Sequence, residues 1–185
     1  MHLPDGTVLW SSRAMPRRPQ TLTSRHAPAL AFASAFIAAV AVLGVVRASG
    51  LEGPAAERVG TWTAAGAYAL LWPAQPGIYV VANVLSTPHG AFRVAESCSG
   101  FDLFGLLAAA MIAYPVAWRR RLAGIALLAP FVFVVNIVRI ASLALIMEHA
   151  PGAFEMVHTV VWQGLFILAG LAFWLTWSAS KPSTA

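Results

Sequence analysis

Four long apolar stretches divide this chain, and shorter polar or charged segments separate them. The stretches cover residues 27–46, 101–118, 122–147 and 157–177. Since a membrane-spanning helix needs about 20 mainly apolar residues, each stretch is near or above the required length. The pattern predicts an all-α fold, a polytopic membrane helical bundle of about four spans. We expect Pro130 to kink the third span.

Composition agrees with a single membrane domain. Hydrophobic residues make up 59% of the 185 positions and charged residues only 10%, whereas soluble domains carry about 25% charged residues. We expect residues 27–177 to form one integral membrane domain, residues 1–26 a disordered basic N-terminus and residues 178–185 a short C-terminal tail. The net charge of +5 comes mostly from arginines that flank the apolar stretches. Such a bias reports topology, so we expect the lipid bilayer, and no nucleic acid, as a partner.

The basic residues also predict an orientation. They lie before the first span, between the second and third, and after the fourth. These residues are Arg13, Arg17, Arg18, Arg25, Arg119, Arg120, Arg121 and Lys181. The positive-inside rule makes all three groups cytoplasmic. We therefore expect a multi-pass protein of the cytoplasmic (inner) membrane, with residues 47–100 and 148–156 on the outer face.

The long outer segment carries patterns of its own. Residues 55–72 have helical composition with an apolar stripe, but they are short for a span and end at Pro73, which favours a helix lying in the outer interface. Residues 78–85 and 91–95 alternate loosely like strands around a turn-rich stretch at 86–90. We interpret them as a small β-hairpin, whose exposed edge would suit an extended peptide.

One permanent charge lies inside the third apolar stretch. Arg139 follows Asn136 by three residues, so the two side chains share a helix face. An arginine at this depth costs several kcal/mol and usually faces a protein interior or a water-filled cavity. Arg139 is therefore a candidate functional residue. The plainer alternative is a structural ion pair with Glu96 or Asp102.

The only cysteine lies at the outer end of the second span. Cys98 stands in the string Glu96-Ser97-Cys98-Ser99-Gly100. A thiol near a helix N-terminus gains thiolate character because the helix dipole favours negative charge. The plainer alternative is a small buried apolar side chain. A single cysteine excludes an internal disulfide and any CxxC site.

A histidine opens the fourth span on the same side of the membrane. His158 follows Glu155 by three residues, and that carboxylate would orient or stabilise the imidazole. His89 and His149 also fall on the outer side, so either is an alternative partner for Cys98. Cysteine as nucleophile, histidine as acid or base and arginine as donor to an oxyanion are the parts that acyl transfer needs. No HExxH motif or histidine cluster is present, and we expect neither a metal nor a cofactor.

These motifs resemble the exosortase/archaeosortase family. The resemblance rests on the string around Cys98, the Asn136-x-x-Arg139 pair in a later span and His158 at the start of the last span. It implies a multi-spanning cysteine transpeptidase whose substrate is a membrane-tethered protein with a C-terminal sorting signal, that is, a short motif, a hydrophobic helix and a basic cluster. By motif, Cys98 would be the nucleophile, Arg139 the catalytic arginine and His158 the third member.

The sequence thus favours an outward-facing cysteine peptidase or transpeptidase in a membrane bundle. Glu96, Asn136 and Glu155 are the expected supporting residues. The alternatives are an anion transporter or channel subunit, in which Arg139 binds the anion, and a non-catalytic membrane scaffold. Neither alternative needs the three candidate residues to lie together.

Overall fold

The computed structural model describes residues 22–95 and 98–180, and within them the chain is mostly helical with a small sheet. Three helical segments are long and apolar enough to cross a bilayer: Ala27–Ala48, Trp118–His149 and Pro151–Ala179. The first belongs to α1 (Leu22–Ala48) and the second is α4 (Trp118–His149), which continues through Pro130. The third combines short turns with α6 (Trp162–Ala179). These segments confirm the predicted membrane helical fold.

The second expected span is shorter than the hydrophobic pattern indicated. Helix α3 runs only from Phe101 to Ala113, which is 13 residues. It ends there because Tyr114 precedes Pro115, and a residue before proline is disfavoured in helical geometry. Tyr114 accordingly has extended backbone angles, φ −68° and ψ 135°. Residues 114–117 form a link to α4 and do not lengthen α3.

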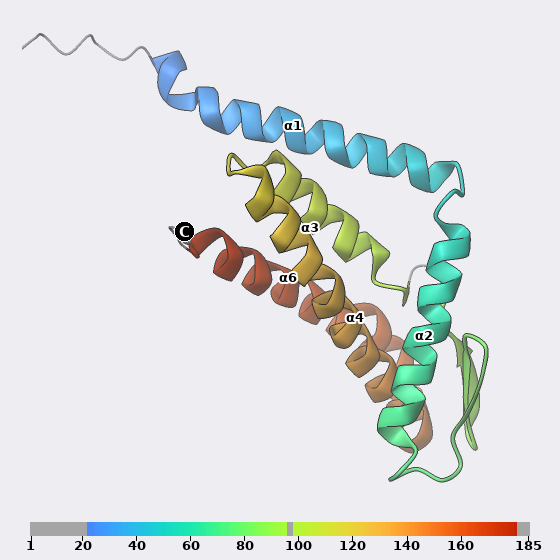
Figure 1. Cartoon of the computed structure of the whole chain (residues 1–185). Coiled ribbons are helices and arrows are strands. Elements are labelled where there is room, and N and C mark those ends of the chain that lie inside the picture. The colour runs from blue at the N-terminus through green and yellow to red at the C-terminus, as the bar shows by residue number, and fades with distance from the viewer. Residues whose placement is uncertain (1–21, 96–97, 181–185) are drawn as a thin grey trace, which may run out of the picture.

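Figure 1 shows how the helices lie relative to one another. Helix α1 packs along α3, and α4 packs against α3 and α6. Helix α2 (Gly53–Leu71) follows α1 after a sharp bend and runs across the far end of this bundle. A helix was expected at residues 55–72, and α2 confirms it.

Small residues allow α2 to approach α4 closely. Ala64 and Ala67 on α2 and Ala144 on α4 are fully buried, and Ala141 is 3% exposed. Small side chains let helix backbones come together where lipid provides little hydrophobic driving force. This packing fixes α2 beside the half of α4 that carries Arg139.

The sheet has one strand more than the predicted hairpin. Strands β1 (Tyr79–Val81), β2 (Val84–Thr87) and β3 (Gly90–Arg93) form an antiparallel sheet in the order β1-β2-β3. The expected first strand is interrupted at Ala82, whose φ of 52° is left-handed. Ala82 and Asn83 form a two-residue turn, and such hairpin turns require positive φ.

Two apolar clusters fill the interior of the described part. One joins α2, the sheet, α4 and α6, and it includes Leu85, Ile140 and Phe166. The other lies near the opposite end of the bundle and includes Met111, Leu128 and Trp177. Many outward-facing side chains of α1, α4 and α6 are large and apolar, for example Val134 and Leu168, as expected for surfaces that contact lipid.

Candidate active site

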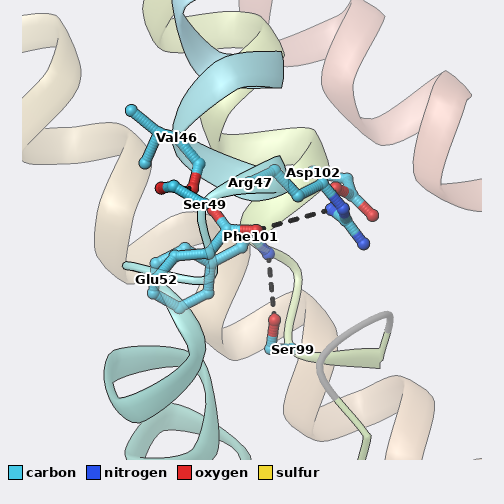
Figure 2. Close-up of polar contacts among 7 residues, drawn as sticks. All are labelled: Val46, Arg47, Ser49, Glu52, Ser99, Phe101 and Asp102. Atoms are coloured by element: carbon cyan, nitrogen blue, oxygen red, sulfur yellow. Dashed lines mark hydrogen bonds and ion pairs between the residues drawn. The ribbon is translucent and has the colours of Figure 1, made fainter.

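The turn that carries Cys98 is held close against α4. Gly100 has φ 81°, a left-handed conformation that favours glycine. A Cβ atom at this position would lie 2.9 Å from Cγ1 of Val132, closer than two carbon atoms can pack. Ser99 is buried, and its Oγ accepts a 3.4 Å hydrogen bond from the backbone N–H of Phe101 in the first turn of α3 (Figure 2). Gly100 is thus required by both conformation and space.

Asn136 connects this turn directly to α4. Its Nδ2 donates a 2.7 Å hydrogen bond to the backbone carbonyl oxygen of Cys98. Asn136 is fully buried, so the bond is shielded from competition by water or lipid headgroups. The supporting position predicted for Asn136 therefore corresponds to a contact with the backbone of the cysteine.

His158 is the histidine that lies beside Cys98. The distance from Cys98 Sγ to His158 Nε2 is 3.3 Å, and Cys98 is 8% exposed. His158 belongs to a π-helical turn, Val157–Val161, directly before α6. Single π-helical turns often occur at functional sites. The ring of Phe154 stacks on the imidazole with a centroid separation of 5.8 Å.

Arg139 faces the same region from α4. Its residue exposure is 6%, and its guanidinium lies over the ring of Phe166, 5.0 Å from the centroid. The guanidinium is close enough to interact electrostatically with both Cys98 and His158. Within residues 22–95 and 98–180, Arg139 Nε has no hydrogen-bond partner. The cation is therefore buried within electrostatic range of the thiol and the imidazole.

Asp102 does not pair with Arg139. Its carboxylate forms an ion pair with Arg47 at the end of α1, and Arg47 lies 3.8 Å from Glu52 as well. Figure 2 shows this cluster where α1, α2 and α3 meet. The alternative in which Arg139 forms a structural ion pair with Asp102 is thus not found. Glu96, the other expected carboxylate partner and a predicted supporting residue, lies outside the described residues.

Three other residues were expected near the site: Glu155, His89 and His149. Glu155 is exposed; it interacts electrostatically with His158, and its backbone oxygen accepts a hydrogen bond from Thr159. His89 pairs with Glu148 at 3.0 Å. His149 Nδ1 lies 2.9 Å from the carbonyl oxygen of Leu145. Both alternative histidines therefore have partners other than Cys98.

The thiol, the imidazole and the buried guanidinium lie in one region of the structure, and a comparison of the whole sequence decides the family relationship. The family model of the transmembrane exosortases matches residues 21–178. The chain belongs to the transmembrane exosortase family. No curated protein and no solved structure matches the chain. The exosortase match makes this a multi-pass membrane protein of a family whose members are generally cysteine transpeptidases.

The sequence analysis did not predict one contact that joins the helices of the candidate site. Trp162 Nε1 donates a 2.8 Å hydrogen bond to Ser142 Oγ, which itself donates to the carbonyl oxygen of Arg139 at 2.8 Å. Trp162 follows His158 by four residues and Ser142 follows Arg139 by three. That spacing was the available signal, because residues three or four apart share a helix face. The bond ties the helix with His158 to the helix with Arg139.

These groups suit acyl transfer at a carbonyl. A thiol beside an imidazole provides an activated nucleophile, and a buried guanidinium provides fixed donors for a developing oxyanion.

Among the described residues, no three side chains of His, Cys, Asp or Glu lie together in a way that would hold a metal ion.

Proposed function

We propose that this exosortase-family chain is a cysteine transpeptidase or peptidase that cleaves the C-terminal sorting signals of exported, membrane-tethered proteins. The observation that carries the proposal is the 3.3 Å separation of Cys98 Sγ and His158 Nε2. The buried guanidinium of Arg139, which lies within electrostatic range of both groups, supports it. A deprotonated thiol, a proton carrier and a fixed cation are the groups that thioester formation needs.

The reaction proceeds through an acyl-enzyme. His158 takes the proton of Cys98, and the thiolate attacks the carbonyl carbon of the scissile peptide bond. Arg139 stabilises the oxyanion of the tetrahedral intermediate. The carbon–nitrogen bond then breaks, His158 gives the proton to the leaving amine, and a thioester remains on Cys98.

An acceptor resolves the thioester in the second half. His158 removes a proton from the acceptor, which attacks the thioester carbonyl. The carbon–sulfur bond then breaks, and His158 returns the proton to the departing thiolate, which regenerates the thiol of Cys98. Water as the acceptor gives proteolysis, whereas an amine or a lipid gives sorting to a new anchor. Asn136 holds the backbone of Cys98 in place during both halves, and Glu155 contributes negative charge near the imidazole.

The proposed site faces the outer side of the cytoplasmic membrane. This orientation is supported by the arginines at positions 119–121, which the positive-inside rule assigns to the cytoplasm. The site lies toward the other end of α4, near Arg139, so the substrate arrives from the outer face. A membrane-impermeant thiol reagent on intact cells should label Cys98, while labelling only after permeabilisation would reverse the orientation.

The decisive experiment follows cleavage of a co-expressed sorting substrate. Cys98→Ser should abolish cleavage and the acyl-enzyme, because an alkoxide is far harder to form than a thiolate beside the same base. His158→Ala should slow both acylation and resolution. Membrane insertion of each variant is checked by fractionation. Normal cleavage in Cys98→Ser would end the cysteine mechanism, and anion transport that survives Cys98→Ala would favour the transporter alternative.

A further inference from the structure

An apolar cavity of about 400 Å³ lies beside the turn that carries Cys98. Ser99 and Gly100, which follow Cys98 in the chain, form one wall together with the first turn of α3. Helix α2 contributes Trp62, and α4 contributes the turn from Ala129 to Phe133. None of the lining residues is charged. This volume is within the range of about 300–1,000 Å³ that is typical of ligand sites.

Helix length and nearby charges place this cavity in the outer half of the membrane. Helix α3 has 13 residues, so it rises about 20 Å from its link to α4, whereas a bilayer core is about 30 Å thick. Asp102 in the first turn of α3 pairs with Arg47 at the end of α1, and both side chains are exposed. Because exposed charges are costly in hydrocarbon, the turn at Ser99 and Gly100 lies near the outer boundary of the core.

Helix α4 gives a second measure of the same depth. Ala129 and Phe133 follow Arg121 by 8 and 12 residues, which corresponds to rises of about 12 and 18 Å. Both lengths are shorter than the core, so the α4 wall of the cavity faces hydrocarbon below its outer boundary. Ala129 and Trp62 are exposed on its rim, so an occupant that enters between them comes from the hydrocarbon and must be apolar.

The position of the cavity favours a protein segment over a lipid chain. The cavity adjoins the backbone of the Cys98 turn through Ser99 and Gly100. An apolar helix that inserts side chains here would be preceded in its own chain by residues that reach Cys98. The small walls at Gly100 and Ala129 allow a helix to approach closely. A lipid chain would fill the same volume without presenting a peptide bond.

We propose that this cavity binds the outward end of the apolar membrane-spanning segment of the protein substrate. The inference rests on the proposed peptidase function. Seating of the substrate helix between α2, α3 and α4 then fixes which peptide bond reaches Cys98. The cut site is selected by its distance from a membrane-embedded helix as well as by the residues around it.

The test uses the purified full chain in vesicles of phosphatidylethanolamine and phosphatidylglycerol. The probe is a synthetic helix of about 20 leucine and alanine residues, with lysines at one end and photoreactive leucine near the other. Irradiation should crosslink the peptide to the walls formed by α2, α3 and α4. Ala129→Trp, which fills the cavity, should reduce crosslinking about tenfold, equivalent to ~1.4 kcal/mol of binding.

Ala126→Trp is the matched control, because Ala126 is exposed on the same helix and does not line the cavity. Labelling of Cys98 by a small maleimide should be equal in both variants, which shows that the site is intact. Unchanged crosslinking in Ala129→Trp, equal loss in both variants, or crosslinks to lipid alone would each overturn the inference. Those outcomes leave the thiol chemistry untouched. Conversely, cleavage that persists in Cys98→Ser would overturn the peptidase proposal without affecting the crosslinks.

Discussion

The hydrogen bond between Asn136 and the Cys98 backbone offers the sharpest test of how the site is held. Asn136→Leu keeps a side chain of similar size but removes the Nδ2 donor, and it leaves the buried carbonyl oxygen of Cys98 without that partner. Loss of a buried hydrogen-bond partner costs about 1–3 kcal/mol. If the cost falls on the position of the nucleophile, acylation slows by roughly 5- to 150-fold. Asn136→Asp should be at least as harmful, because it sets a carboxylate oxygen against the carbonyl oxygen.

The assay measures single-turnover formation of the acyl-enzyme on a sorting substrate in reconstituted vesicles. Thr63→Val is the matched control: Thr63 is also fully buried, and its Oγ1 has no hydrogen-bond partner among the described residues. It should acylate at the rate of the parent protein. The thermal unfolding midpoint in detergent separates a general loss of stability from a displaced nucleophile. Acylation by Asn136→Leu within twofold of the parent rate would refute the positioning argument.

Three further predictions concern other parts of the site. Arg139→Lys keeps the charge but loses the planar multi-donor group, so cleavage in single-turnover assays should slow by about 10²–10³, the usual effect of removing an oxyanion donor. A normal rate would show that only the positive charge of Arg139 is needed. Gly100→Ala should destabilise the protein by at least about 1–2 kcal/mol from the left-handed φ alone, measured by unfolding in detergent. Adding Val132→Ala to this variant should recover only the part of the loss that comes from the clash between the new Cβ atom and Val132. Trp162→Phe and Ser142→Ala should each lower the free energy of unfolding by about 1 kcal/mol. In a double-mutant cycle the double variant should lose less than the sum of the two single losses, whereas strict additivity would show that the Trp162–Ser142 bond contributes nothing.

The sequence alone determined the membrane character of the fold and its candidate chemistry. Prediction of membrane spans depends on the local density of apolar residues, because a helix crosses a bilayer when enough consecutive residues are apolar. Arg139 was conspicuous because a permanent charge in such a stretch is costly. The motifs around Cys98, Arg139 and His158 also led to the family that the whole-chain comparison established.

The sequence could not fix where elements begin and end when local geometry opposed the apolar pattern. Hydrophobicity continues through Pro115, but the geometry before proline ends α3 at Ala113. The apolar run at residues 78–85 reads as one strand, but the left-handed backbone of Ala82 divides it into β1 and β2. In both places a single backbone conformation outweighed the composition of the segment.

Only the tertiary structure decided which side chains meet. Asp102 and Glu96 were equal candidates as partners of Arg139, but Asp102 pairs with Arg47, 55 residues earlier in the chain. The choice of His158 over His89 and His149 as the neighbour of Cys98 depends on how α6 packs against α4, a contact that includes the bond from Trp162 to Ser142. The cavity beside Gly100 depends on the close approach of three helices. Helix periodicity predicts which face of a helix a residue occupies. The segment that packs against that face is often distant in sequence, so the local pattern of residues does not identify it.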